Sequence, residues 1–238
     1  MNANGHARGA ALEGAIQTVA TLFGGLIVGL LAGTLLFGLL PGSDVDAPAG
    51  AHVVIAALPA FAGFLAGGAL WGKAMGRLAG LEDKARAARA GMLGFAPITI
   101  VLAIALGVLE PVIVQMVGLP IHRVFTLVFV ASAVLIAAAS TWWLGRVIVG
   151  PSSAWALAWP VGLAAGLAFL VVNLLMESLG WIVGGPNAAA RATMLTVMSL
   201  GNIAAALAGG AVLGWTLARA PERAGRDREE AMTVAGSQ

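Results

Sequence analysis

Residues 92–118 read MLGFAPITIVLAIALGVLEPVIVQMVG, an apolar run whose only charged residue is Glu110. A membrane-spanning helix needs about 20 mostly apolar residues, so this run is long enough to cross a bilayer. An ionisable side chain inside such a run is costly to bury and usually has a functional role or a partner. The run therefore predicts a membrane protein with a polar site at Glu110.

Similar runs fill most of the 238-residue chain, which is 60% hydrophobic and 10% charged. Soluble domains average about 25% charged residues, so this composition predicts an all-α integral membrane protein. We expect six transmembrane helices in one bundle over residues 15–218. The expected spans are residues 15–40, 52–72, 92–118, 123–145, 154–183 and 192–218.

The positions of the basic residues predict an orientation. Of the 13 Lys and Arg residues, only Arg123 and Arg191 fall on the side opposite the termini. The positive-inside rule then places both termini in the cytoplasm of an inner or plasma membrane. Residues 1–14 form a cytoplasmic N-terminal segment, and residues 219–238 form a charged, disordered tail. Because topology accounts for the basic residues, we expect the lipid bilayer as a partner and no nucleic acid.

Tryptophans provide the expected anchors at the cytoplasmic interface, since the chain has no tyrosine. Trp side chains gather at membrane–water interfaces, where the ring is apolar and the N–H is hydrated. The residues expected in this aromatic belt are Trp71, Trp142, Trp143, Trp155 and Trp215.

Short sequences recur along the spans and leave two interpretations open. The sequence LAGGA occurs at Leu65–Ala69 and again at Leu207–Ala211, and Gly and Arg follow both copies at the same offsets. Glu110 and Glu177 precede Gly- and Pro-containing span ends at nearly the same distance. The first interpretation is three tandem helical hairpins around a pseudo-threefold axis. The second is chance matching in a sequence rich in Ala, Gly and Leu.

Glycines spaced by four residues follow one face of several spans, as at Gly25, Gly29 and Gly33. Such a stripe lets two helices approach closely in lipid. The stripes can pack helices within one chain, or they can form a seam in a homo-oligomer or against partner membrane subunits.

Polar residues within the spans predict one polar pocket. Glu177 follows Asn173 by four residues, so the two share a helix face. Glu110 precedes Pro111, whose missing N–H leaves the carbonyl of Gly107 without its helical partner. The predicted ion or solute ligands are Glu110, Glu177, Asn173, Asn202, Ser199 and Gln115, with Arg191, Arg123 and His122 at the rim.

Two functions fit these residues. The first is a small solute or ion permease, or its membrane component, in which the intramembrane carboxylates bind a cation or a proton. The second is a non-catalytic, multi-pass subunit of a larger membrane complex, in which the glutamates bond across helices or pair with Arg123 or Arg191. The sequence contains no HExxH, phosphate-loop or Gly-x-Ser-x-Gly motif. We therefore expect no metal, no cofactor and no enzymatic activity, although Glu110 and Glu177 could still form a catalytic carboxylate pair.

Overall fold

The structure, a computed structural model, describes residues 3–39, 49–117, 121–181 and 188–235. Side chains are described over residues 5–29, 31–32, 59, 61–99, 101, 123–124, 126–181 and 196–219. The described residues form six helices and no strand, which confirms the predicted all-α fold. The helices are α1 (Ala3–Leu39), α2 (Ala49–Leu78), α3 (Lys84–Val117), α4 (Ile121–Ile148), α5 (Ala154–Ser178) and α6 (Ala188–Ala235).

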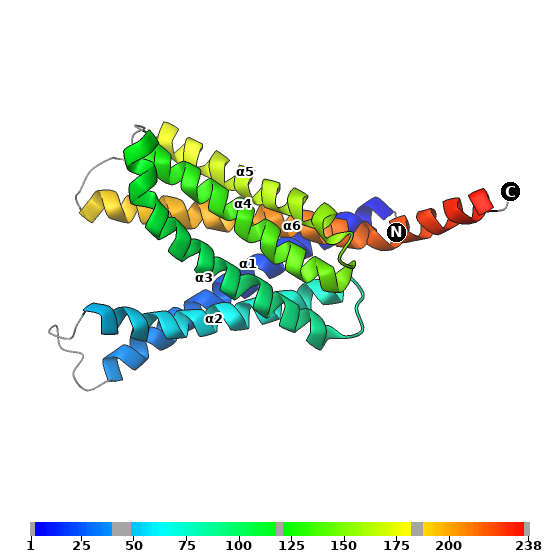
Figure 1. Ribbon diagram of the computed structural model, residues 1–238, viewed down its shortest axis with the longest axis horizontal. Coiled ribbons are helices and arrows are strands. Elements are labelled where there is room, and N and C mark those ends of the chain that lie inside the picture. Colours follow the sequence, from blue (N-terminus) through cyan, green and yellow to red (C-terminus); the bar gives the residue numbers. More distant parts are fainter. Residues whose placement is uncertain (1–2, 40–48, 118–120, 182–187, 236–238) are drawn as a thin grey trace.

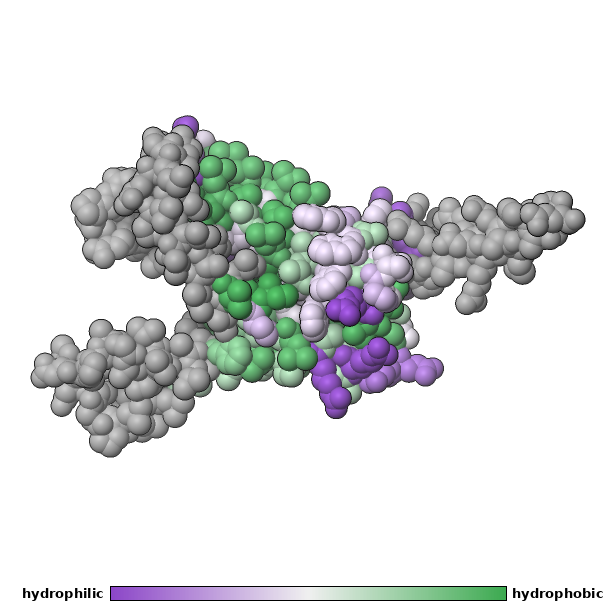
Figure 2. Space-filling view, in the orientation of Figure 1, coloured by the Kyte–Doolittle hydropathy of each residue, from purple (hydrophilic) through white to green (hydrophobic). Residues whose placement is uncertain are grey.

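Within the described residues, four helical segments are long and apolar enough to cross a membrane. They are Gly5–Gly29, Thr126–Ile148, Ala154–Ser178 and Thr196–Arg219. The surface agrees with this assignment, because apolar residues cover the middle of the visible face in Figure 2 and hydrophilic residues gather at one end. These features together indicate a membrane protein.

The helices form a closed ring. Each helix packs against the next one in sequence, and α6 packs against α1. Figure 1 shows that both termini and the α2–α3 and α4–α5 connections lie at one end, where the helices converge. At the other end the α1–α2 hairpin diverges from α3, α4 and α5. We call these the closed end and the open end of the bundle.

Buried side chains fill the centre of the ring at the closed end. They come from α2, α3, α4, α5 and α6, and Leu22 of α1 packs against them. The core cluster consists of Trp71, Ala74, Met75, Ala90, Leu144, Leu157, Val161, Leu213 and Leu217. Close packing of this kind holds helices together in lipid, where the hydrophobic effect between helices is weak. The described side chains therefore block the axis of the ring at this end.

Trp71 lies in the core cluster and not in the interfacial belt, so the sequence-based placement of this residue was wrong. Its Nε1 donates a hydrogen bond to Thr18 Oγ1 at 3.1 Å, which joins α2 to α1. A tryptophan ring can be buried once its N–H has a partner. The sequence could not show that Thr18 provides that partner, because the two residues lie on different helices.

Glycines terminate α2 and α5 in the same way. Gly80 and Gly180 both have a φ of 71°, in the left-handed region that favours glycine. At α2, Gly80 N–H donates to Arg77 O and Leu81 N–H donates to Gly76 O, at 3.0 and 2.9 Å. This pair of bonds is a Schellman motif, which satisfies carbonyls at the helix end.

Glycines also set the spacing between α1 and α2. A methyl group placed on Gly25 would meet the carbonyl oxygen of Gly63 and would lie 2.7 Å from Cα of Gly67. These contacts are with backbone atoms, which cannot move aside as a flexible side chain can. The two helices can therefore approach this closely only where both carry glycine.

The α2–α3 seam is built on the same principle. A methyl group on Gly91 would meet the carbonyl oxygen of Gly68 and would lie 2.6 Å from Cα of Gly72. In the described residues, these glycine stripes thus pack helices within one chain.

Both terminal segments are helical in the structure. Helix α1 already begins at Ala3, and α6 continues to Ala235, through residues that we expected to form a disordered tail. Both segments contain several Ala residues, and the C-terminal one is also rich in Arg and Glu, all of which have high intrinsic helix propensity. Each segment also extends a helix that is already nucleated, so it does not have to form an isolated first turn.

Candidate polar site at the open end

The described side chains include five of the predicted site residues: Asn173 and Glu177 on α5, Ser199 and Asn202 on α6, and Arg123 on α4. The other four lie outside the described side chains. These are Glu110, Gln115, His122 and Arg191. The geometry of the site therefore rests on α4, α5 and α6.

Asn173 is held rigidly between α5 and α6. Its side chain is 5% exposed, and Nδ2 donates a hydrogen bond to the carbonyl oxygen of Phe169 at 3.0 Å. Gly201 of α6 faces this amide, since a methyl group there would lie 3.1 Å from Nδ2. Phe169 is buried and stacks on Phe129 of α4, with ring centroids 6.2 Å apart. The amide is thus fixed in place where three helices meet.

Glu177 lies one helical turn beyond Asn173 toward the open end and forms an ion pair with Arg123. Oε1 of Glu177 is 3.8 Å from Nη2 of Arg123, and the two side chains are 35% and 61% exposed. A pair this exposed to water contributes at most about 1 kcal/mol. The structure therefore places Glu177 next to one of the two arginines that sequence analysis had considered as its partner.

Ser199 and Asn202 lie on the face of α6 that points into the ring. At 3.6 residues per turn, Asn202 lies about three turns before Leu213, and Ser199 lies about five turns before Leu217. Residues a whole number of turns apart project from the same side of a helix. Leu213 and Leu217 are buried in the core cluster, whereas Ser199 and Asn202 are exposed. The inward face of α6 is therefore covered at the closed end and accessible at the open end.

A buried hydroxyl on α4 lies three residues before Leu144 of the core cluster. Among the described residues, Thr141 Oγ1 on α4 is buried and has no hydrogen-bond partner. Leaving such a group unpaired costs about 1–3 kcal/mol. The neighbouring Ser140 behaves differently, since its Oγ donates to the carbonyl oxygen of Gly94 on α3 at 3.2 Å. Thr141 thus adds a polar group on α4 beside the apolar core cluster.

An aromatic and cationic cluster at the closed end was only partly predicted from the sequence. Trp142, Trp143 and Trp155 lie together as expected, with Trp142 and Trp155 ring centroids 5.3 Å apart. Trp159 stacks on Trp155 at 6.1 Å, and the guanidinium of Arg146 lies 5.0 Å from the Trp142 ring centroid. Arg146 is four residues after Trp142, a spacing that could have indicated this contact. The cluster is suited to the membrane–water interface.

The described residues contain no group of three His, Cys, Asp or Glu side chains that could hold a metal ion. The accessible groups at the open end are the Asn202 amide, the Ser199 hydroxyl and a carboxylate paired with a guanidinium, whereas the Asn173 amide is buried. Such groups can bind a cation, a proton or a small polar solute by hydrogen bonds and charge. None of them is arranged as a nucleophile with an activating base.

The fold and the polar site thus define a helical membrane protein with accessible polar groups at one end of its bundle. Compared with protein-family models, curated proteins and solved structures, the chain has no match.

Proposed function

We propose that this protein is a small solute or ion permease, or the membrane component of one, with six transmembrane spans. The observation that carries this proposal is the exposure of Ser199 and Asn202 on the inward face of α6, above a core that blocks the other end. Polar side chains that remain exposed on this face are available to a solute entering from the open end. A pathway that opens to one side at a time requires both features.

In this proposal the polar groups of the open end bind the solute. Asn202 offers an amide oxygen, and Glu177 and Glu110 offer carboxylates that hold a cation or a proton. Asn173 is buried, so it can act as a ligand only after α5 and α6 separate. When Glu177 separates from Arg123, the negative charge of Glu177 becomes available to the solute. Solute binding therefore competes with the Arg123–Glu177 ion pair. Passage to the closed end then requires the core cluster to part, which is the second state of an alternating-access cycle.

The geometry of the α6–α1 seam supports three tandem hairpins. A methyl group on Gly14 would meet the carbonyl oxygen of Gly210 and would lie 2.9 Å from Cα of Gly214. Gly91 meets α2 in the same pattern. Gly210 and Gly68 are corresponding residues of the two LAGGA copies. A cyclic repeat of three hairpins accounts for this match. In such a repeat α6 corresponds to α2, and its neighbour in the ring, α1, corresponds to α3.

The α4–α5 seam supports the same interpretation. A methyl group on Gly162 would lie 2.8 Å from the carbonyl oxygen of Val134 and 3.3 Å from the backbone nitrogen of Ala138. It thus meets residues i and i+4 of the preceding helix, as at the other two seams. The larger residues on α4 explain why the sequence repeat is weak there.

We further propose that the closed end faces the cytoplasm, with both termini on that side. The chain has no cysteine, so single substitutions can report the topology. In intact cells, a membrane-impermeant maleimide is expected to label Ser178→Cys, at the open end. Labelling of Ala85→Cys and Ser152→Cys, at the closed end, is expected only after permeabilisation. All three native residues are exposed, so burial would not prevent the reaction. Labelling of Ser152→Cys in sealed cells would overturn the proposed orientation.

The alternative function is a non-catalytic subunit of a larger membrane complex. The Arg123–Glu177 pair favours it, because a carboxylate already paired across two helices can serve as a structural contact. The two functions differ in one measurable property, since a self-sufficient permease moves a solute when reconstituted alone and a non-catalytic subunit does not.

A further inference from the structure

Aromatic rings and one guanidinium join α4 and α5 at the closed end. Ring contacts connect Trp143, Trp142, Trp155 and Trp159 in that order, with successive ring centroids 6.1, 5.3 and 6.1 Å apart. The guanidinium carbon of Arg146 lies 5.0 Å from the ring centroid of Trp142 and 5.6 Å from that of Trp143. We call these five residues the Trp–Arg patch.

The surrounding helices hold the Trp–Arg patch in a fixed arrangement. Beside Arg146 in the sequence, a methyl group on Gly145 would lie 3.4 Å from Cα of Ala154, so α4 and α5 are in close contact here. Trp143 is fixed from the other side, since a methyl group on Gly94 of α3 would lie 2.9 Å from its Cβ. A ligand of the patch therefore does not have to order these rings when it binds, which favours affinity.

Arg146 keeps its hydrogen-bond donors for a ligand. Stacking on the tryptophans uses the flat face of the guanidinium and leaves the N–H groups at its edge. Arg146 is exposed, and within the part of the chain that the structure describes it forms no ion pair and no side-chain hydrogen bond. The patch is thus complementary to a negatively charged group that can accept hydrogen bonds.

The two tryptophans of α5 indicate that this negatively charged group belongs to a lipid. Trp155 and Trp159 are 50% and 48% exposed, so both rings are available to a partner. They are the second and sixth residues of the candidate span Ala154–Ser178, and the four residues between them extend about 6 Å along the helix into the span. Tryptophan at such a position lies at the headgroup level of a bilayer. A soluble anion would contact only Arg146, whereas a phospholipid would also place its glycerol region against both rings.

We propose that the Trp–Arg patch binds an anionic phospholipid from the leaflet at the closed end, with the lipid phosphate on the Arg146 guanidinium. Arginine can hold phosphate through two parallel, charge-assisted hydrogen bonds. A lipid with a net negative charge is favoured over phosphatidylcholine, because Arg146 repels the quaternary ammonium group of that lipid. The inference does not depend on the proposed transport function.

The test measures lipid binding to the full-length protein in detergent micelles by native mass spectrometry. The protein is titrated with phosphatidylglycerol or with phosphatidylcholine of the same acyl chains. The wild type is expected to bind phosphatidylglycerol at least about tenfold more tightly, and Arg146→Gln is expected to remove most of that preference. Arg89→Gln is the matched control and is expected to keep the preference, because it removes the same charge from an exposed position of α3 at the closed end.

A second variant tests the aromatic part of the patch. Trp155→Leu retains Arg146 and removes one exposed ring, so it is expected to weaken binding of both lipids about threefold. Equal affinity of the wild type for the two lipids would overturn the proposal. An equal loss in Arg146→Gln and Arg89→Gln would also overturn it, because diffuse surface charge would then account for binding. Displacement of phosphatidylglycerol by inorganic phosphate would assign Arg146 to a soluble anion and contradict a lipid site.

Discussion

Gly25→Ala is expected to lower the free energy of unfolding by about 1–3 kcal/mol, the usual cost of overpacking a tight contact. The added methyl group would meet the carbonyl oxygen of Gly63 and lie 2.7 Å from Cα of Gly67. Both are backbone atoms of α2, so relief requires the two helices to move apart. The measurement is unfolding in mixed detergent micelles, followed by helical circular dichroism.

The neighbouring glycine provides the matched control. A methyl group on Gly24 would have nothing within 4 Å. Alanine is also a better helix former than glycine, by about 0.5–1 kcal/mol. Gly24→Ala is therefore expected to leave the protein unchanged or slightly more stable. Equal stabilities of the two variants would contradict the close α1–α2 packing described above.

Asn202→Leu is expected to reduce solute flux through reconstituted protein about tenfold or more. The substitution removes a polar group from the accessible inward face of α6, and a hydrogen bond to a charged species is worth about 1.5–3 kcal/mol. Flux would be measured in proteoliposomes as dissipation of an imposed proton or cation gradient.

The control for this variant lies on the same helix. Leu200 is exposed and projects about 200° around α6 from Asn202, on the side facing lipid. Leu200→Ala is expected to keep the flux of the wild type, and both variants should elute as the same folded species. Wild-type flux in Asn202→Leu would show that Asn202 takes no part in solute transport.

The sequence was sufficient to predict that the protein is helical and that it belongs to the class of membrane proteins. Apolar runs of bilayer length predicted the all-α fold, because backbone groups in lipid must bond within a helix. One helix end was predicted wrongly, since we expected a span over residues 154–183, whereas α5 ends at Ser178, just before Gly180 with its positive φ. The limits of α1 and α6 were less predictable, because a charged segment next to a formed helix can either remain helical or fray.

The ring arrangement could not be predicted from composition. Gly25 was visible as a member of a glycine stripe, but glycine spacing does not identify the helix that a stripe meets. The partner is set by the tertiary arrangement, as Trp71 also illustrates: its burial depends on a hydroxyl 53 residues away, on α1.

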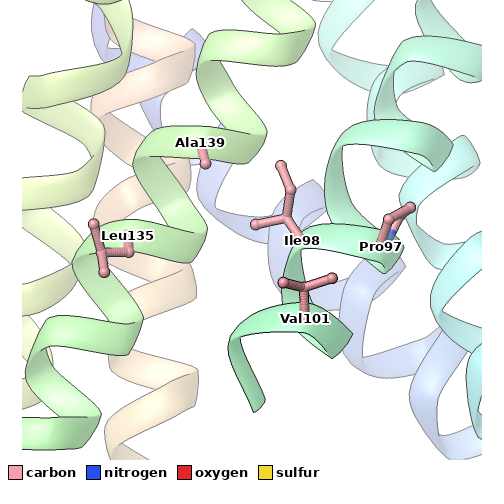
Figure 3. A pocket seen from close by; sticks show the side chains of 5 residues that line it. All are labelled: Pro97, Ile98, Val101, Leu135 and Ala139. Carbon is pink, nitrogen blue, oxygen red and sulfur yellow. The ribbon is translucent and has the colours of Figure 1, made fainter. Parts of the chain in front are cut away.

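The membership of the polar site stays a prediction, and its contacts could not be derived from the sequence. Asn173 and Glu177 both lie on α5, about one turn apart. Periodicity alone could not choose between Arg123 and Arg191 as a partner of Glu177. The apolar groove lined by Pro97, Ile98 and Val101 of α3 and by Leu135 and Ala139 of α4 (Figure 3) gave no signal in the sequence, because only the separation of the two helices forms it.

The most direct test of the permease proposal is proton uptake by proteoliposomes, with and without an imposed pH gradient, followed with an entrapped pH-sensitive dye. The wild type is expected to take up protons faster than protein-free vesicles, and Glu110→Gln and Glu177→Gln are each expected to slow the uptake. Glu13→Gln is the control, because Glu13 pairs with Arg77 at the closed end, away from the site. Folded wild-type protein that shows no uptake above protein-free vesicles under any gradient, or equal rates in all the variants, would contradict the proposal.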